Sequence, residues 1–503
     1  MTDWKKLKSG SDVRGDAVGE NAPLTEEVAE RLGAAFARYT AKHAGKAVQD
    51  VTISIGRDSR ITGPQLLSAA ARGVTKAGAS VLAFGMCTTP AMYMSILTEG
   101  FQPDSAIMIT ASHHPWNRNG LKFFLPEGGI DGKTVGILLD MAAEVDTAGL
   151  TETGKVTEVP FLPTYKQQLA DRIRKGLNTD AAKPLEGLHV AVDAGNGAGG
   201  FYADMLASLG ADVAGSQFLD PDGMFPNHIP NPENPDAMAS VRQAVLNSKA
   251  DLGVIFDTDC DRAAVVDAEG REINRNRLIA LISAILLEEK PGQTIVTDSV
   301  TSSGLRDFIA AHGGVHYRFK RGYRNVIDEA IRLIGEGQEC PLAIETSGHA
   351  AMRENHFLDD GMYLVTVLIV RAMLLKKQGK SLSSMIDDLR EPVEASEIRM
   401  TITEEDFRPF GQAAIDAVLA KAEADPAWHI APDNREGIRI SFDLNGGKEN
   451  GWFLLRLSVH DPVLPLNVES DVAGGVKQMV KALLDVLKDL PGIDLKPLQA
   501  AAE

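Results

Sequence analysis

Short apolar runs alternate with longer amphipathic stretches along most of the chain, a pattern typical of layered α/β folds. Three of the apolar runs are β-branched and end at an aspartate that precedes small residues; they lead to Asp58, Asp193 and Asp298. Each run predicts a strand, a turn and the start of a helix. The similar spacing of the aspartates favours three related α/β domains in tandem. Any three strand–helix units can share this pattern, so an internal duplication stays open.

Polar, turn-rich segments divide the pattern at 147–155, 267–272 and 377–394. Beyond the last of them, GIRISF and WFLLRLSV predict strands, and VKQMVKALLDVLKDL predicts a final helix. A chain of 503 residues is too long for a single hydrophobic core. We therefore expect three similar α/β domains with mixed sheets, followed by a smaller C-terminal α+β domain. The expected bounds are 1–155, 156–270, 271–385 and 386–503.

The charge of the chain restricts its partners. Lys and Arg number 51 against 69 Asp and Glu, which gives a net charge of −18. We expect no nucleic-acid partner and no membrane partner, because polyanions are bound by cationic surfaces. The longest apolar stretch, 363–375, is broken by Arg371, is too short to cross a bilayer and predicts a buried helix. Small phosphorylated ligands stay open, since they need only a local basic pocket.

The cysteines and the start of the chain bear on location. Cys87, Cys260 and Cys340 stand far apart and form no C-x-x-C pair, which favours a reducing compartment. The first residues, MTDWKKLKSGSD, contain no apolar core of a secretory signal. We therefore expect a cytoplasmic protein.

The segment 109–122, ITASHHPWNRNGLK, carries the first candidate chemistry. Its apolar lead-in predicts a strand, after which Ser112 stands beside His113, with Lys122 beyond an Asn-Gly turn. A serine hydroxyl is a weak nucleophile until a base or a metal activates it. The segment therefore predicts either a reactive serine loop or a surface turn that holds two histidines.

The segment 250–262 runs from an apolar strand directly into three alternating aspartates: Asp257, Asp259 and Asp261. Three carboxylates in a tight loop repel one another unless a cation lies between them, and such oxygen ligands suit Mg²⁺, Mn²⁺ or Ca²⁺. An EF-hand is excluded, because Arg262 and Ala268 occupy the positions of its glycine and glutamate. The loop predicts a divalent metal site, with a solvated acidic turn as the alternative.

Three further segments are ambiguous when taken alone. GNGAGG at 195–200 fits the dinucleotide pattern G-x-G-x-x-G, which would indicate an oxidoreductase, but it also fits a tight strand–helix turn. ETSGH at 345–349 offers a carboxylate, a hydroxyl and an imidazole, which suit sugar hydroxyls and proton transfer. RLSVHDP at 456–462 offers Arg456 and Ser458 to a phosphate, or ends a strand in an ordinary turn.

The order of these segments resembles the α-D-phosphohexomutase superfamily over nearly the whole chain. TASHHP resembles its phosphoserine loop T-A-S-H-N-P, and DTDCDR resembles its metal loop D-G-D-G-D-R. ETSGH resembles the sugar loop G-E-x-S-G-H, RLSVHDP the phosphate loop R-x-S-N/G-T-x-P, and SDVRG the D-I-R-G element that contains Arg14. The segment at 222–235 also resembles a family segment.

The resemblance implies four domains around a central cleft and a phosphohexomutase. Such an enzyme interconverts hexose 1-phosphate and hexose 6-phosphate, here of mannose and/or glucose, through a phosphoserine and a 1,6-bisphosphate. The implied cofactors are one Mg²⁺ and a hexose 1,6-bisphosphate as activator and intermediate, and the implied partners are small hexose phosphates. The oligomeric state stays open between monomer and dimer.

The resemblance also implies roles for individual residues. The implied metal ligands are Ser112, Asp257, Asp259 and Asp261. The implied catalytic residues are Ser112, Lys122, His349, His113 and Arg14. The implied substrate-binding residues are Glu345, Ser347, Arg324, Arg456, Ser458 and Arg262.

The chain departs from the superfamily motifs at a few positions. His114 replaces an asparagine of the serine loop, and Cys260 replaces a small turn residue of the metal loop. Val459, His460 and Asp461 alter the phosphate loop, which leaves phosphate affinity and sugar preference open. Phosphoglucosamine mutase and a catalytically silent sugar-phosphate-binding homologue are the alternatives.

Overall fold

The computed structural model describes residues 2–458 and 461–503. It divides into two compact units, Met1–Leu278 with Ser347–Ser384, and Ile279–Thr346 with Met385–Glu503. Val459 and His460, two of the departures noted above, lie outside the described residues. In the part of the chain that is described, no helix combines the length and the apolar character needed to cross a bilayer.

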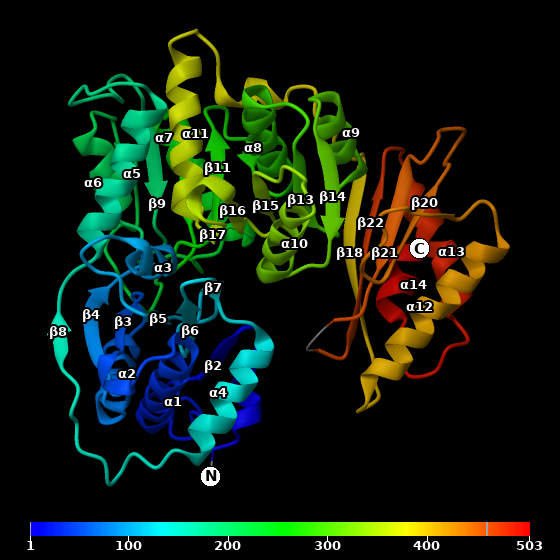
Figure 1. The fold of residues 1–503 in the computed structure, drawn as a ribbon. Coiled ribbons are helices and arrows are strands. Elements are labelled where there is room, and N and C mark those ends of the chain that lie inside the picture. The colour runs from blue at the N-terminus through cyan, green and yellow to red at the C-terminus, as the bar shows by residue number, and fades with distance from the viewer. Residues whose placement is uncertain (1, 459–460) are drawn as a thin grey trace. The chain divides into compact units, whose positions relative to one another are not determined.

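The first unit begins with a mixed sheet in the order β1-β2-β6-β5-β3-β4-β8, with β7 paired to β6 (Figure 1). Its strands are β1 (Lys8–Ser9), β2 (Asp12–Asp16), β3 (Thr52–Arg57), β4 (Ser80–Met86), β5 (Ser105–Ile109), β6 (Arg118–Leu125), β7 (Gly128–Gly129) and β8 (Val156–Glu158). Its helices are α1 (Glu26–Ala44), α2 (Gly63–Lys76), α3 (Thr89–Leu97) and α4 (Gly132–Glu144), with the 3-10 turns η1 (Trp4–Leu7) and η2 (Val48–Asp50). β3, β4, β5 and β8 run parallel, whereas β2 and β6 run antiparallel to their neighbours.

Local sequence explains these elements. The run SAIMI of β5 is buried along its whole length, as expected of a central strand that is covered on both faces. Helix α1 begins after Thr25, whose hydroxyl accepts a hydrogen bond from the Val28 N–H, and it ends at the left-handed Gly45. Between helix and sheet, the Phe36 and Phe123 rings pack with centroids 4.8 Å apart. This core fixes β5 and β6, whose ends carry the serine loop.

A second sheet of the same unit has the order β12-β11-β10-β9. Its strands are β9 (Val190–Asp193), β10 (Leu252–Phe256), β11 (Ala263–Asp267) and β12 (Glu272–Ile273), and its helices are α5 (Leu162–Gly176), α6 (Phe201–Ser208) and α7 (Pro235–Ser248). β10 is parallel to β9 and antiparallel to β11, so the chain reverses sharply between the two buried strands β10 and β11. The aspartate triplet occupies this reversal.

The later part of the first unit contains β16 (Ala350–Met352), η3 (Arg353–Asn355), β17 (Leu358–Asp359) and α11 (Gly361–Lys376), and the 3-10 turn η4 (Leu382–Ile386) carries the chain into the second unit. β16 and β17 form an antiparallel hairpin. Helix α11 is buried over most of its length and packs against α5 and β11, which confirms the predicted buried helix. Helix α8 (Asn276–Glu289) carries the chain from the first unit into the second.

The second unit contains the parallel strands β14 (Val315–Phe319), β13 (Thr294–Asp298) and β15 (Leu342–Ile344), with helices α9 (Ser303–Ala311) and α10 (Tyr323–Gly335). Its C-terminal part is an antiparallel sheet in the order β18-β22-β21-β20-β19. These strands are β18 (Glu394–Thr401), β19 (His429–Ile430), β20 (Ile438–Phe442), β21 (Gly451–Leu455) and β22 (Val463–Ser470).

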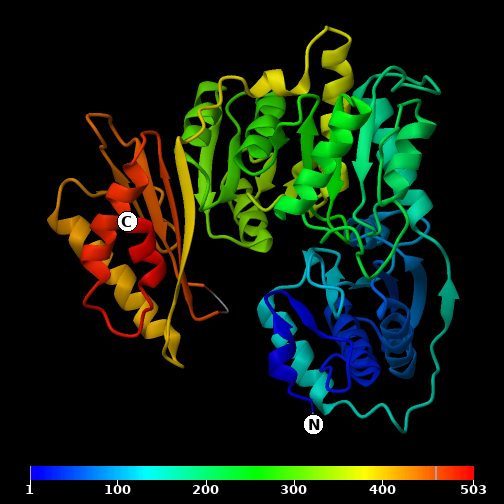
Figure 2. The same cartoon turned by 180° about the vertical axis from the view of Figure 1, so that it is seen from behind.

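Helices α12 (Phe407–Ala424), α13 (Gly475–Leu487) and α14 (Lys496–Ala502) pack on this last sheet (Figure 2). The rings of Trp428, Phe442 and Phe453 pack edge-on or tilted against one another within its core. The strands predicted from GIRISF and WFLL, and the helix predicted from VKQMVKALLDVLKDL, are confirmed as β20, β21 and α13. This helix is not the last one as expected, because α14 follows it. The four domain boundaries expected from the sequence stay a prediction.

Candidate functional site

Ser112 lies directly after β5 in an unusual backbone conformation. Its φ is +51°, in the left-handed region that non-glycine residues avoid, and its side chain is buried. The Ser112 N–H donates to Thr110 Oγ1 (2.8 Å), and the Thr110 hydroxyl donates to Asp58 Oδ2 (2.6 Å). The strand-end Asp58 that the sequence pattern singled out thus helps to hold the serine loop.

The aspartate triplet lies beside this serine. Asp257, Asp259 and Asp261 are buried, and each offers a carboxylate oxygen within 4.8 Å of those of the other two. The Ser112 hydroxyl donates to Asp257 Oδ2 at 3.1 Å. The chain turns within the loop at Cys260, which takes the left-handed conformation with φ +65°. The two most specific sequence motifs are therefore brought together in one unit.

The donor set fits a hard divalent cation. Among the described residues, no hydrogen-bond donor reaches Asp259 Oδ1 or Asp261 Oδ1, although both atoms are buried. Buried carboxylate oxygens without donors are costly unless a cation or water satisfies them. Burial and the neighbouring Asp261 charge raise the pKa of Asp257 well above its ordinary value. These three residues could hold a metal ion through oxygen atoms alone.

Two cations from different strands face the triplet. Lys122, on β6, lies 3.0 Å from Asp259 Oδ2 and also pairs with Asp261. Burial works to lower the pKa of Lys122, but the charges of Asp259 and Asp261 outweigh it and raise that pKa well above its ordinary value. Arg262 donates to Asp257 Oδ2 (3.0 Å) and, through Nη2, to Ser112 Oγ (3.1 Å). Both side chains are therefore held as cations beside the serine.

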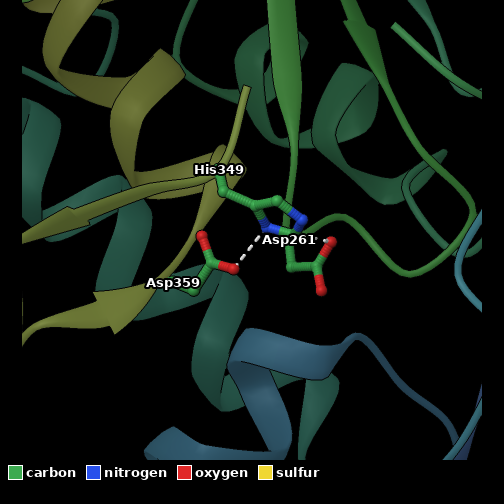
Figure 3. Close-up of side chains that lie close together, drawn as sticks. All are labelled: Asp261, His349 and Asp359. Carbon is green, nitrogen blue, oxygen red and sulfur yellow. Dashed lines mark hydrogen bonds and ion pairs between the residues drawn. The ribbon is translucent and has the colours of Figure 1, made fainter. Parts of the chain in front are cut away.

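His349 belongs to a second acidic cluster in the same unit. Its Nδ1 donates to Asp359 and lies 3.9 Å from Asp261 Oδ1 (Figure 3). Burial works to lower the pKa of His349, but Asp359 and Asp261 outweigh it and raise that pKa to about 9. His349, Asp261 and Asp359 are close enough to hold a metal ion, but the bond between His349 and Asp359 accounts for their approach without one.

The other residues predicted near the serine lie around it. His113 Nδ1 is 3.3 Å from Ser112 Oγ, and its ring stacks on that of His114 at a centroid distance of 4.9 Å. Burial and the Arg262 charge lower the pKa of His113, so its imidazole is neutral. Arg14 Nη2 donates to Asp12 Oδ2 at 2.6 Å, and no acceptor among the described residues reaches its Nε.

The sugar loop is divided between the units. Glu345, in the second unit, is buried and accepts a hydrogen bond from the Gly322 N–H at 2.6 Å. Ser347, in the first unit, has a buried Oγ without a hydrogen-bond partner among the described residues. The Arg324 guanidinium pairs with Asp328, one helical turn away, at 2.9 Å.

The described residues of the phosphate loop, 456–458 and 461–462, belong to the second unit. The backbone N–H groups of Arg456 and Ser458 donate to Pro465 and Val463, and the Asp461 N–H donates to Ser458 Oγ. Burial and the Arg321 charge lower the pKa of Arg456. Arg456 Nε is buried, and no described residue accepts a hydrogen bond from it. An anion that accepts from this guanidinium would satisfy it.

The glycine-rich segment 195–200 is a packing turn. Gly195 and Asn196 take positive φ values of 53° and 59°, and a Cβ on Gly197 would lie 2.7 Å from the Thr258 carbonyl oxygen. The N–H groups of Asn196 and Ala198 already donate to the carbonyls of Phe218 and Thr258. These donors are not available to cradle a pyrophosphate, which disfavours the oxidoreductase interpretation, and the turn instead supports the metal loop.

Sequence reasoning missed two residues that orient this site. Thr89, at the start of α3, donates its N–H to the Asp259 backbone oxygen (2.9 Å) and its hydroxyl to Asp259 Oδ2 (2.5 Å). Asp359 orients His349, as described above. Neither residue belongs to one of the predicted loops. The only sequence signals were a Thr-Pro pair after β4 and a paired Asp-Asp after a hydrophobic run, both of which are common at turns.

Models of known families match this chain in three consecutive segments. They are described as phosphoglucomutase/phosphomannomutase, alpha/beta/alpha domains I, II and III, and they match residues 5–136, 165–270 and 274–393. The chain belongs to the phosphoglucomutase/phosphomannomutase family. This membership confirms the suspected superfamily, the fold class and the predicted enzyme class, an isomerase of the intramolecular phosphotransferase type.

Individual relatives of this family extend over nearly the whole chain. A phosphoglucomutase of Neisseria gonorrhoeae is 31% identical over 482 residues, which cover 95% of this chain and 96% of that protein. A phosphomannomutase/phosphoglucomutase of Pseudomonas aeruginosa is 29% identical and covers 95% of this chain and 94% of its own length. A crystal structure of a phosphoglucomutase/phosphomannomutase family protein from Burkholderia thailandensis superposes with a TM-score of 0.80 at 27% identity, covering 98% of this chain and 99% of that one.

Proposed function

We propose that this enzyme interconverts hexose 1-phosphates and hexose 6-phosphates of mannose and/or glucose, with Ser112 as the phosphoryl carrier. One observation carries the proposal: the buried Ser112 Oγ lies 3.1 Å from both Asp257 Oδ2 and Arg262 Nη2. A serine placed between a carboxylate triplet and a guanidinium is suited to holding a phosphoryl group. The names of the relatives agree with this substrate class.

The phosphoryl group would pass from Ser112 Oγ to the free O1 or O6 hydroxyl of a hexose phosphate. The bond from phosphorus to Oγ breaks as the bond to the sugar oxygen forms, and the hydroxyl proton leaves to a base. The product is a hexose 1,6-bisphosphate, which serves as intermediate and activator. After this intermediate turns around, its other phosphoryl group returns to Ser112 and the isomeric monophosphate leaves.

Charge near the serine supports this transfer. Arg262 and Lys122 are cations beside the triplet, and Arg14 is a third basic residue for the phosphoryl oxygens. Bound by Ser112 and the three aspartates, one Mg²⁺ would offset the negative charge that develops on the transferred group. A positioned cationic environment of this kind is the main contribution a protein makes to phosphoryl transfer.

Proton transfer is assigned to residues with defined partners. Because His349 Nδ1 binds Asp359, a proton exchanged with the sugar would move at Nε2. The Lys122 ammonium, held charged by its two aspartates, is suited to donating a proton to an oxygen that loses its phosphoryl group. His113 Nδ1 lies 3.3 Å from Ser112 Oγ, but the lowered pKa makes its imidazole a weak base, so we assign it a lesser part in proton transfer than His349 and Lys122.

We assign recognition of the sugar and its second phosphate to the two remaining loops. The buried Glu345 carboxylate and the buried Ser347 Oγ, which has no hydrogen-bond partner among the described residues, are suited to the sugar O3 and O4 hydroxyls. Arg456 and Ser458 are suited to the distal phosphate, with Arg324 as an additional cation. A cytoplasmic location remains part of the proposal, as do small-molecule hexose phosphates as partners, with no nucleic-acid partner and no membrane partner.

A substrate panel tests the proposal. Purified enzyme with Mg²⁺ and a hexose 1,6-bisphosphate primer is given glucose 1-phosphate, mannose 1-phosphate or glucosamine 1-phosphate, and 6-phosphate formation is measured. We expect turnover with glucose and/or mannose and a loss of at least about 1,000-fold in Ser112→Ala. Ser68→Ala, on the exposed side of α2, is the matched control and keeps full activity. Turnover only with glucosamine 1-phosphate would change the assignment to phosphoglucosamine mutase. A failure to form product from any of the three sugar phosphates would refute the proposal.

A further inference from the structure

Among the described residues near the serine loop, Arg60 is the buried cation whose side chain donates the most hydrogen bonds. It belongs to none of the predicted motifs. It lies between β3 and α2, and its side chain has no exposed surface. Its guanidinium donates to four backbone carbonyls of the loop: Ser112 (2.5 Å), His114 (2.6 Å), Pro115 (2.7 Å) and Arg118 (2.9 Å). One planar side chain thus binds the loop at both ends and in the middle.

Arg60 also contacts Asp58, which supports the serine loop through Thr110. Arg60 Nε lies 3.3 Å from Asp58 Oδ2, and the Arg60 N–H donates to Asp58 Oδ1 at 2.9 Å. Asp58 in turn accepts from Thr110, whose hydroxyl oxygen accepts from the Ser112 N–H. The backbone of Ser112 is therefore held through its N–H on one side and through its carbonyl on the other.

These contacts hold Ser112 in a backbone conformation that serine does not favour. A serine with φ +51° is strained, and such strain persists only where the surroundings fix the backbone. A buried guanidinium is unfavourable unless it is paired, and here both Nη atoms donate to loop carbonyls while Nε forms only an ion pair with Asp58. The Phe225 ring covers the guanidinium at 5.2 Å from its centroid, which closes the remaining face.

We propose that Arg60 is the positioning residue that holds Ser112 in its left-handed conformation, so that Oγ reaches Asp257 and Arg262. The proposal rests on the proposed function, in which Oγ carries the phosphoryl group. In the described part of the chain, the Arg60 guanidinium bonds to Asp58 and to backbone carbonyls of the loop, and to no side chain to which we assign a substrate contact. Its loss should therefore change the rate of transfer and leave substrate binding nearly unaltered.

The test compares Arg60→Lys and Arg60→Ala with the wild-type enzyme. Lysine keeps a positive charge beside Asp58 but cannot reach four carbonyls, so we expect kcat to fall by about 100-fold with KM within about threefold. Millimolar guanidinium ion should restore part of kcat in Arg60→Ala. Arg72→Ala, which removes a partly exposed arginine paired with Glu30 and Glu26, is the matched control and should keep wild-type kcat without any guanidinium effect.

A second measurement separates positioning from the proposed function. Hydrogen–deuterium exchange in Arg60→Lys should accelerate over residues 110–118 and stay unchanged over 252–267. If exchange accelerates and the wild type proves to have no mutase activity, the proposed function fails and the positioning of the loop stands. A folded Arg60→Lys enzyme with wild-type kcat and wild-type exchange at 110–118 would overturn the proposal. An Arg60→Lys enzyme in which KM rises by the same factor as kcat falls would also overturn the proposal.

Discussion

At the scale of single residues, the site is defined by side chains that orient other side chains. Asp58 and Thr110 hold the Ser112 N–H, Thr89 holds Asp259, and Asp359 holds His349. Each of these contacts fixes which atom of Ser112, Asp259 or His349 faces the rest of the site. Supporting bonds of this kind tune metal affinity and proton transfer even though they touch no substrate.

The variant Thr89→Val tests the effect of one such supporting bond. Valine has the shape of threonine but lacks the hydroxyl that donates to Asp259 Oδ2, whereas the backbone bond to Asp259 remains. We expect Mg²⁺ affinity, measured by isothermal titration calorimetry, to fall about 10-fold, since lost supporting bonds typically cost 10- to 100-fold. Thr98→Val, at the far end of α3, should bind Mg²⁺ like the wild type. Equal affinity of Thr89→Val and wild type would show that the hydroxyl does not orient the ligand.

At the scale of elements, residues of the site and of its supporting turn lie where strands end. β5 ends before Ser112, β10 ends before Asp257, and β9 ends at Asp193. The sequence could predict these positions, because a buried β-branched run followed by polar residues marks a strand end. It could not predict that Arg60 or Thr89 supports the loops, because those contacts join residues far apart in the chain and depend on how β3, β4 and β10 are arranged.

Domain II contains a pH-sensitive pair at one such strand end. His228 Nε2 lies 3.0 Å from Asp193 Oδ2 and its Nδ1 lies 3.0 Å from the Ile229 carbonyl oxygen, so both ring nitrogens face acceptors. Burial works to lower the pKa of His228, but its bond to Asp193 and the charge of that carboxylate outweigh it and raise the pKa. The imidazolium is therefore favoured more strongly in the folded chain than in the unfolded chain.

The sign of the pH effect follows from this raised pKa. The charged pair stabilises the fold fully below the ordinary histidine pKa of about 6.5, and the contribution is lost as pH rises through the folded value. We expect the gap in unfolding free energy between wild type and His228→Gln to be about 1–3 kcal/mol at pH 6 and smaller at pH 9. Denaturant unfolding at both pH values measures it, with His429→Gln, on the partly exposed β19, as control. A gap that grows with pH would contradict this account.

At the scale of the whole molecule, the proposed machinery is distributed over two units. The first contains Ser112, the aspartate triplet and His349, and the second contains Glu345 and Arg456. The sugar loop spans the boundary, since Glu345 and Ser347 belong to different units. The net charge of −18 coexists with a few buried cations beside the serine, so an acidic chain is compatible with a doubly phosphorylated ligand.

Metal removal should be visible in the stability of the chain. A cation that binds only the folded state stabilises it by about 2.7 kcal/mol at a concentration 100 times its Kd. We therefore expect the thermal unfolding midpoint of the wild type to rise with Mg²⁺ and to return to its starting value with a chelator. Asp259→Asn should lose this response, whereas Asp171→Asn, at an exposed site on α5, should keep it. Equal responses in all three proteins would place the metal elsewhere.

The central claim is that Ser112 carries the phosphoryl group, and intact-mass measurement tests it most directly. Wild-type enzyme incubated with glucose 1,6-bisphosphate and Mg²⁺ should gain one phosphoryl group, located on Ser112 by peptide mapping, and should lose it to added hexose monophosphate. Ser112→Ala should gain none, and Ser68→Ala should behave like the wild type. A wild-type enzyme that turns over without ever carrying this group, or that carries it on another residue, would contradict the account.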